Sequence, residues 1–154
     1  MTTWAPHVVY VEGGNTFWLQ HCLEQGGWAP PILNACTGPE ATSVYIGKSA
    51  GAIVAGATVE TATWKGWDDP SVVPGRETYE DWLGCPGLAM VDQKSFFPHM
   101  SADWVALVKQ KQHDMKDQER SKHIVCLQEW DAYCVDGTSL TAMMVSGEPS
   151  TATK

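Results

Sequence analysis

A five-residue motif, Gly47–Gly51 (GKSAG), stands between an apolar run and a stretch of small residues. The run Val44–Ile46 has the pattern of a buried strand, and the small residues that continue to Ala57 suit a helix packed closely on a sheet. A Gly-x-Ser-x-Gly sequence between a strand and a helix is typical of a sharp turn that projects the serine beyond the sheet. The glycines let strand and helix approach without Cβ clashes. The motif therefore predicts an α/β domain with Ser49 as a candidate nucleophile.

The rest of the chain alternates short strands and helices and ends in a hairpin. Predicted strands cover Val8–Val11, Ser95–Phe97 and His123–Leu127. Predicted helices cover Phe17–Gln25 (capped by Asn15 or Thr16), a short stretch from Pro30, and Ala102–Gln112. A predicted hairpin joins Ala132–Val135 to Leu140–Val145 through Asp136 and Gly137. This order favours an α/β fold with a mostly parallel sheet and a C-terminal hairpin. We expect one domain over residues 1–146 and a flexible tail over 147–154.

Composition excludes several classes of function. Hydrophobic residues make up 44% of the 154 residues and charged residues 18%, which is typical of a globular protein. The formal net charge of −8 comes without a basic stripe, so nucleic acid is not an expected partner. No run approaches the roughly 20 apolar residues of a membrane helix, and the N-terminus does not have the pattern of a signal peptide, so we expect a cytoplasmic protein.

The five cysteines predict buried, reduced thiols. Their number is odd and no two have C-x-x-C spacing, which favours neither a disulfide framework nor a thiolate zinc site. We therefore expect no metal and no cofactor.

A serine nucleophile needs a base, and His99 is the histidine best placed to provide one. It follows Phe97 and Pro98 at the end of a predicted strand, where catalytic groups concentrate, whereas the other four histidines lie near the terminus, within predicted helices or at the start of a strand. The residues alone leave the acid open. It lies either between serine and histidine, among Glu60, Asp68, Asp69, Glu77, Glu80, Asp81 and Asp92, or after the next strand, at Glu129.

A glycine pair, Gly13 and Gly14, follows the first predicted strand and precedes the first helix. Its amides would open at the carboxyl edge of a parallel sheet, where ligands bind in such folds. The helix after Ser49 would likewise direct its free amides at this edge, where an oxyanion would be held.

Three segments together resemble peptidase E (aspartyl dipeptidase) and its cyanophycinase relatives. They are Val11–Phe17 (VEGGNTF), Tyr45–Ala52 (YIGKSAGA) and Phe97–His99 (FPH), in the family's order, and the resemblance extends from about residue 8 to 145. It implies a class I glutamine-amidotransferase-like α/β fold with flavodoxin-like layering. It also implies a serine peptidase that hydrolyses small peptides.

The resemblance also implies roles for individual residues. Ser49 would attack the substrate, His99 would act as base, and the amides of Gly14 and Ala50 would hold the oxyanion. Gly13 and Asn15 belong to the same substrate-binding segment as Gly14. The segment Leu127–Glu129 resembles the part of the family that carries an acid, which favours Glu129 as the third member of the triad, with Asp68 and Asp69 as alternates.

The chain departs from the family pattern in two ways. Members usually run well over 200 residues and begin with a strand and a helix that are not found here before the glycine pair. A smaller sheet, a partner chain over the exposed edge or a fragment of a longer protein would each account for this, and we expect a homodimer or higher homo-oligomer. Only Arg120 stands where peptidase E uses an arginine to hold an acidic substrate side chain. Two alternative functions are an inactive or regulatory amidotransferase-like binding module and a hydrolase of another acyl or amide substrate.

Overall fold

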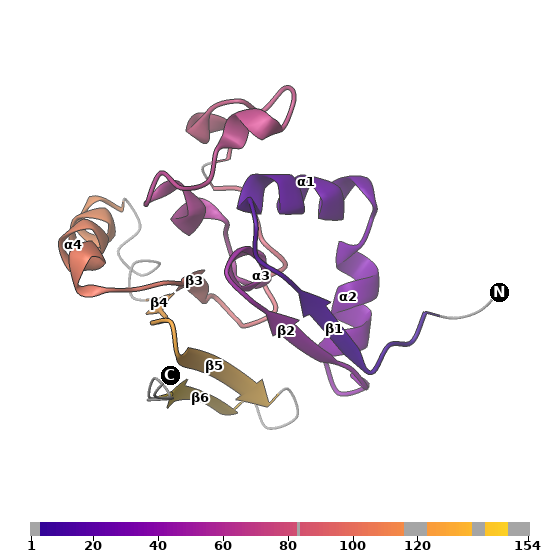
Figure 1. Ribbon diagram of the computed structural model, residues 1–154. Coiled ribbons are helices and arrows are strands. Elements are labelled where there is room, and N and C mark those ends of the chain that lie inside the picture. The colour runs from indigo at the N-terminus through magenta and orange to yellow at the C-terminus, as the bar shows by residue number, and fades with distance from the viewer. Residues whose placement is uncertain (1–3, 83, 116–122, 137–140, 148–154) are drawn as a thin grey trace, which may run out of the picture.

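Helices and short strands alternate along the chain (Figure 1). The computed structural model describes residues 4–82, 84–115, 123–136 and 141–147. The strands are β1 (Val8–Val11), β2 (Val44–Gly47), β3 (Ser95–Phe97), β4 (Ile124–Cys126), β5 (Asp131–Asp136) and β6 (Thr141–Ser146). The α-helices are α1 (Thr16–Gln25), α2 (Ala29–Cys36), α3 (Ala50–Ala55) and α4 (Val105–Asp114), and four short 3-10 helices are η1 (Glu60–Thr63), η2 (Pro70–Val72), η3 (Tyr79–Asp81) and η4 (Ala102–Trp104).

Local capping explains where α1 begins and ends. The side chain of Asn15 accepts a hydrogen bond from the backbone amide of Trp18 at 3.0 Å, which satisfies one of the free amides of the first turn. The helix stops at Gly26, and Gly27 takes a φ of 62° that a residue with a side chain rarely adopts. The predicted helix and its Asn15 cap are therefore confirmed.

The strands pair in three separate ladders. β1 pairs in parallel with β2, β3 pairs in parallel with β4, and β5 and β6 form an antiparallel hairpin. The α/β class and the closing hairpin are confirmed, but among the described residues the ladders do not merge into one sheet. Helix α3 instead packs against both parallel pairs, and the amide of Ala57 after α3 donates to the carbonyl of Lys94 just before β3 at 2.7 Å.

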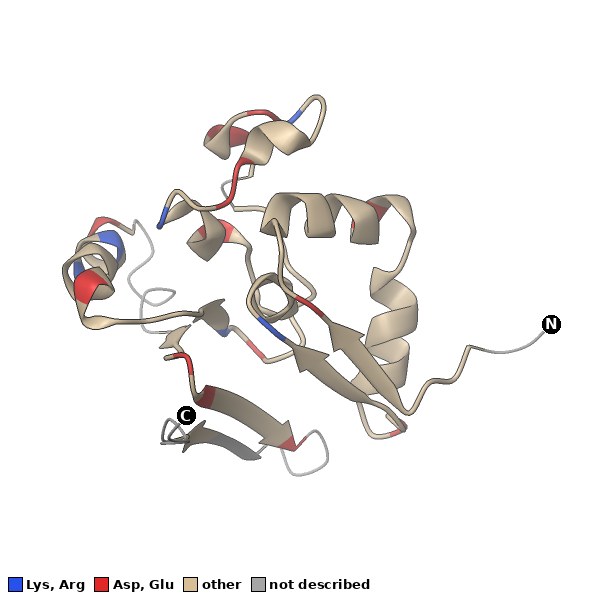
Figure 2. Ribbon diagram, in the orientation of Figure 1, with Lys and Arg blue, Asp and Glu red and all other residues tan. Residues whose placement is uncertain are grey.

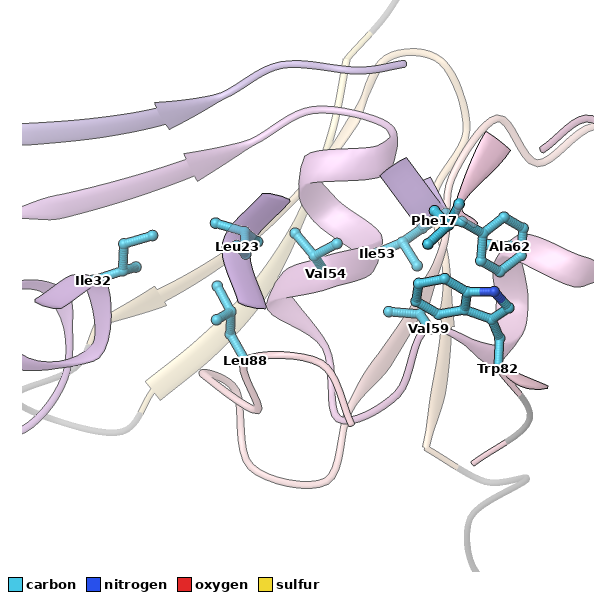
Figure 3. Close-up of a cluster of buried hydrophobic side chains, with 10 residues drawn as sticks. Phe17, Leu23, Ile32, Ile53, Val54, Val59, Ala62, Trp82 and Leu88 are labelled. Atoms are coloured by element: carbon cyan, nitrogen blue, oxygen red, sulfur yellow. The ribbon is translucent and has the colours of Figure 1, made fainter. Parts of the chain in front are cut away.

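The main core lies between α1, α3 and the segment that follows η1 (Figure 3). Phe17 and Trp82 are both fully buried, and their ring centroids are 5.0 Å apart. A second, smaller cluster of Trp64, Phe97 and Val108 supports the end of β3. Trp82 is thus a central core residue.

The two faces of the β1–β2 pair differ in burial. Val9 and Tyr45 point towards the helices and pack against the main core. On the opposite face Val8, Tyr10, Val44 and Ile46 are each about half exposed. Parallel strands are normally covered by other elements on both faces, whereas among the described residues this pair is covered on one face only.

Charged residues are spread thinly over the described part of the chain, and α4 carries Lys as well as Asp side chains (Figure 2). Among the described residues, none of the helices has the length and apolar character needed to span a bilayer. Three parts of the sequence interpretation lie outside the described residues: Arg120, the stretch 137–140 of the predicted hairpin, and the predicted tail from residue 148 onward.

Candidate active site

Ser49 occupies a sharp turn between β2 and α3. Its backbone has a φ of 53° and a ψ of −112°, a combination that costs on the order of 1–3 kcal/mol and persists only where the surroundings fix it. Three hydrogen bonds fix this turn. The amide of Lys48 donates to the carbonyl of Val11 at 2.9 Å, that of Gly51 donates to Lys48 at 2.9 Å, and that of Ile53 donates to Ser49 at 3.1 Å. The strained turn predicted from the motif is therefore present.

The glycines around Ser49 are required by close backbone approach. A Cβ on Gly47 would overlap the carbonyl group of Gly51, and a Cβ on Gly51 would overlap the carbonyl group of Val11. A Cβ on Gly13 would lie 3.1 Å from the Cβ of Ser49, which places the glycine pair directly beside the hydroxyl. The turn after β1 and the turn after β2 thus meet at one edge.

His99 reaches the same edge from the second parallel pair. It lies two residues after β3 and, like Ser49, has a φ of 53°. Its Nε2 is 2.9 Å from the Oγ of Ser49, and its Nδ1 is 2.7 Å from a carboxylate oxygen of Glu129, the third residue after β4. One imidazole therefore connects a hydroxyl from the β1–β2 pair to a carboxylate that follows β4, the partner strand in its own pair.

Glu129 remains ionised at lower pH than an ordinary glutamate. The hydrogen bond with His99 and then the charge of that imidazole lower the pKa of Glu129. Its side chain is 62% exposed, whereas that of His99 is 32% exposed. The carboxylate is consequently available as a charged partner for His99 at neutral pH, in contact with solvent.

A second acidic contact ties the ends of β1 and β2 together. Glu12 forms an ion pair with Lys48 at 3.2 Å and accepts a hydrogen bond from Tyr10 at 2.6 Å. The Tyr10 hydroxyl, the Gly13 amide and Lys48 together lower the pKa of Glu12 to about 2. Both charged groups are exposed, so this contact contributes little to stability. It joins the residue before Gly13 to the residue before Ser49.

Comparison with known proteins identifies the family of the chain. The family model described as "Peptidase family S51" matches residues 4–143, which is most of the chain. The chain belongs to peptidase family S51. The resemblance to peptidase E and its cyanophycinase relatives is thereby confirmed. Among curated proteins none matches the chain.

A solved structure shares the fold of this S51 chain. It is a protein from Listeria monocytogenes EGD-e described as a candidate peptidase E, 22% identical in sequence, with a TM-score of 0.64. The match covers 92% of the present chain and 60% of the Listeria chain. The present chain thus spans less than two thirds of that relative.

The carboxylates of the alternate acids of the S51 chain form their hydrogen bonds with groups other than His99. Asp68 accepts a hydrogen bond from the amide of Thr16 at 3.2 Å, at the start of α1. Asp69 caps η2 by accepting from the amide of Ser71 at 2.9 Å, and its carbonyl accepts from the side chain of Asn15 at 2.9 Å. Among the described residues, His99 forms its carboxylate hydrogen bond with Glu129 and with neither of these aspartates.

The amides of Gly14 and Ala50 are free of partners within the described residues. Gly14 has a φ of 135°, which favours glycine, and Ala50 is the first residue of α3. Gly14 follows Gly13, and Ala50 follows Ser49, at the two turns that meet. These two amides are therefore free backbone donors directly next in the chain to Gly13 and to the nucleophile.

Lys65 and Trp67, which the motifs of this S51 protein did not single out as site residues, line a small pocket beside Ser49. The pocket holds about 40 Å³ and is lined by both members of the Ser49–His99 pair together with Lys65, Trp67 and Asp68. Trp67 is 61% exposed, and its ring centroid is 6.1 Å from that of His99. Trp67 therefore forms part of the pocket wall, whereas Trp64 is buried in the smaller core cluster.

Metal ligation does not account for this site. Within the described ranges, no group of three or more His, Cys, Asp or Glu side chains could hold a metal ion. The groups at the rim are instead a hydroxyl, an imidazole, a carboxylate and backbone amides, which is the set that acyl transfer uses.

Proposed function

We propose that this chain is a serine peptidase that hydrolyses small peptides through a triad of Ser49, His99 and Glu129. The observation that carries the proposal is the distance of 2.9 Å between the Ser49 hydroxyl and the His99 imidazole, together with the carboxylate on the far nitrogen. This is the geometry of a nucleophile, a base within hydrogen-bond reach, and a third group that orients the base. Family membership supports the same reaction class.

The first half of the reaction forms an acyl-enzyme. With one proton on Nδ1 facing Glu129, Nε2 of His99 accepts the hydroxyl proton as Oγ of Ser49 attacks the peptide carbonyl carbon. The amides of Gly14 and Ala50 donate to the oxyanion of the tetrahedral intermediate. The imidazolium then returns its proton to the leaving amine as the C–N bond breaks, which leaves the acyl group on Ser49.

Water completes the cycle. His99 takes a proton from a water molecule, whose oxygen attacks the acyl carbon, and a second oxyanion forms against the same two amides. When this intermediate collapses, Oγ of Ser49 leaves and recovers the proton from His99, and the carboxylic acid is released. Glu129 keeps the imidazole oriented and stabilises its charged form in both halves.

Covalent labelling tests the proposal. A fluorophosphonate probe should modify Ser49 in the folded protein, and peptide mass mapping should find the adduct on that residue alone. Ser49→Ala should abolish labelling and lower peptide turnover by on the order of 10⁴-fold or more. Folded wild-type protein that takes up no probe would contradict the proposal and favour an inactive binding module.

Substrate choice is tested separately. Dipeptides with Asp, Glu and neutral N-terminal residues, offered to wild type and to Ser49→Ala, would distinguish an acidic preference from a broader one. Labelling at Ser49 without hydrolysis of any dipeptide would point to another acyl or amide substrate.

A further inference from the structure

The backbone that carries His99 departs from a regular parallel ladder. Leu127 donates its amide to the carbonyl of Phe97 at 3.0 Å and accepts from the amide of Met100 at 2.8 Å. In a regular parallel pair, one residue forms two such bonds with residues of the neighbouring strand that are two positions apart. Here the two partners, Phe97 and Met100, are three positions apart. One extra residue therefore stands in the strand, which makes this stretch a bulge of the kind that re-aims side chains beside active sites.

Lys65 binds the two carbonyls of this bulge. Its Nζ donates to the carbonyl of Pro98 at 2.5 Å and to that of His99 at 2.9 Å. Leu127 uses neither of these carbonyls, because its two ladder bonds go to Phe97 and Met100. The lysine thus provides the hydrogen bonds that the β4 strand does not provide at this point.

Aromatic rings enclose the same ammonium group. Nζ lies 4.4 Å from the ring centroid of Trp67, 4.4 Å from that of Phe97 and 5.4 Å from that of Trp104. A cation over the faces of aromatic rings is attracted by their quadrupoles, the more so when it is partly removed from water. The side chain is therefore held from several sides, and its position relative to residues 98 and 99 is fixed.

Holding a lysine here has an energetic cost. Burial lowers the pKa of Lys65 to about 8, because the charged form loses solvent in this pocket; Cys126, Glu129 and Asp68 act in the opposite direction. A strongly perturbed lysine in a cleft beside a nucleophile is a pattern associated with function. The two carbonyls and three rings give the reason for its position.

We propose that Lys65 is a positioning residue that holds the bulge at Pro98 and His99 in the conformation in which the imidazole meets Ser49. The proposal rests on the proposed peptidase function, since it assigns Lys65 a part in assembling that triad. Lys65 acts through the backbone of His99 and takes no part in proton transfer.

The rate constant for fluorophosphonate modification tests this directly, because it reports activation of Ser49 without a known substrate. Lys65→Met keeps the length of the side chain and removes its donors, and it should slow labelling by on the order of 10²-fold, the cost of a displacement of about 1 Å at a reacting pair. Lys65→Arg keeps the charge and the donors and should restore the rate to within about tenfold of wild type. Lys109→Met, on the exposed side of α4, is the matched control and should label at the wild-type rate.

Folding is monitored by circular dichroism and thermal melting for every variant. If Lys65→Met does not fold, Lys65→Gln takes its place, since its shorter side chain withdraws the donor from the carbonyls while remaining polar. Its labelling should slow in the same way. Folded Lys65→Met or Lys65→Gln protein that labels as fast as wild type would overturn the proposal.

A second measurement separates this proposal from the proposed function. The ¹⁵N chemical shifts of the His99 ring report its hydrogen bonds whether or not the serine reacts. We expect the shifts of both ring nitrogens to move towards solvent values in Lys65→Met and to stay at wild-type values in Lys109→Met. Absence of labelling in wild type would overturn the peptidase proposal alone, and unchanged ring shifts in Lys65→Met would overturn the positioning role.

Discussion

The two parallel strand pairs build the two halves of the candidate site in different ways. The β1–β2 pair presents Ser49 and the glycine pair through tight turns whose shape is set by their own residues and by backbone contacts within the pair. The β3–β4 pair presents Glu129 just after β4 and His99 through a bulge whose two carbonyls bind Lys65, 33 and 34 residues away. The nucleophile half is therefore held by backbone contacts between its own two strands and their turns, and the base half depends on a side chain from outside its strand pair.

The halves also differ in burial. Behind Ser49 lie the buried residues Ala50, Ile53 and Val54 of α3. Glu129, at the far end of the other half, is mostly exposed. A packed element transmits a backbone change directly to the nucleophile, whereas an exposed carboxylate is screened by water. We thus expect substitutions in the first half to act on folding and substitutions in the second half to act on rate.

The largest effect in this comparison should come from Gly51→Ala. The added methyl group would overlap the carbonyl of Val11, so α3 would have to move away from β1, and we expect a loss of about 3 kcal/mol in the free energy of unfolding. Gly75→Ala is the matched control: its φ of 81° is strained for alanine, but its Cβ meets no atom within 4 Å, so its loss should be about 1 kcal/mol. Urea unfolding measures both losses, and equal losses would contradict the explanation that Gly51 is required by the close approach of α3 to β1.

A smaller effect is expected from Glu129→Gln. The amide keeps the shape of the side chain but loses the charge that faces His99, and because the site is exposed we expect labelling to slow by about tenfold to a hundredfold, less than the ~10⁴-fold loss typical of a buried triad acid. Stability should be nearly unchanged.

Asp68→Asn and Asp69→Asn are the matched variants for the choice of acid. Their carboxylates serve the start of α1 and the cap of η2, so labelling should stay near the wild-type rate. A loss in either that exceeds the loss in Glu129→Gln would assign the third member of the triad to that aspartate.

The same contrast explains how much could be predicted from the sequence. The strand–turn–helix around Ser49 and the cap of α1 are local features, and motif and capping rules located both. The position of His99 at a strand end was also visible. Residue patterns left the acid open between Glu129 and the acidic residues that lie between Ser49 and His99, because the pairing of β3 with β4 brings Glu129 to His99 across 30 residues.

Lys65 and the broken sheet could not have been predicted in the same way. A lysine after a short 3-10 helix carries no local signal, and its role arises only when β3 passes beside it. Similarly, alternating strands and helices indicate an α/β class but not whether the ladders merge, because three-residue strands such as β3 and β4 leave few groups for lateral pairing.

The measurement that tests the joint action of the two halves most directly is the fluorophosphonate labelling rate of His99→Gln against wild type. The glutamine keeps a polar side chain but cannot act as a base at neutral pH. If the two strand pairs assemble one catalytic unit, labelling of Ser49 should fall by on the order of 10³-fold or more while the variant stays folded. A folded His99→Gln protein that labels at the wild-type rate would show that Ser49 reacts without the imidazole and would contradict the account.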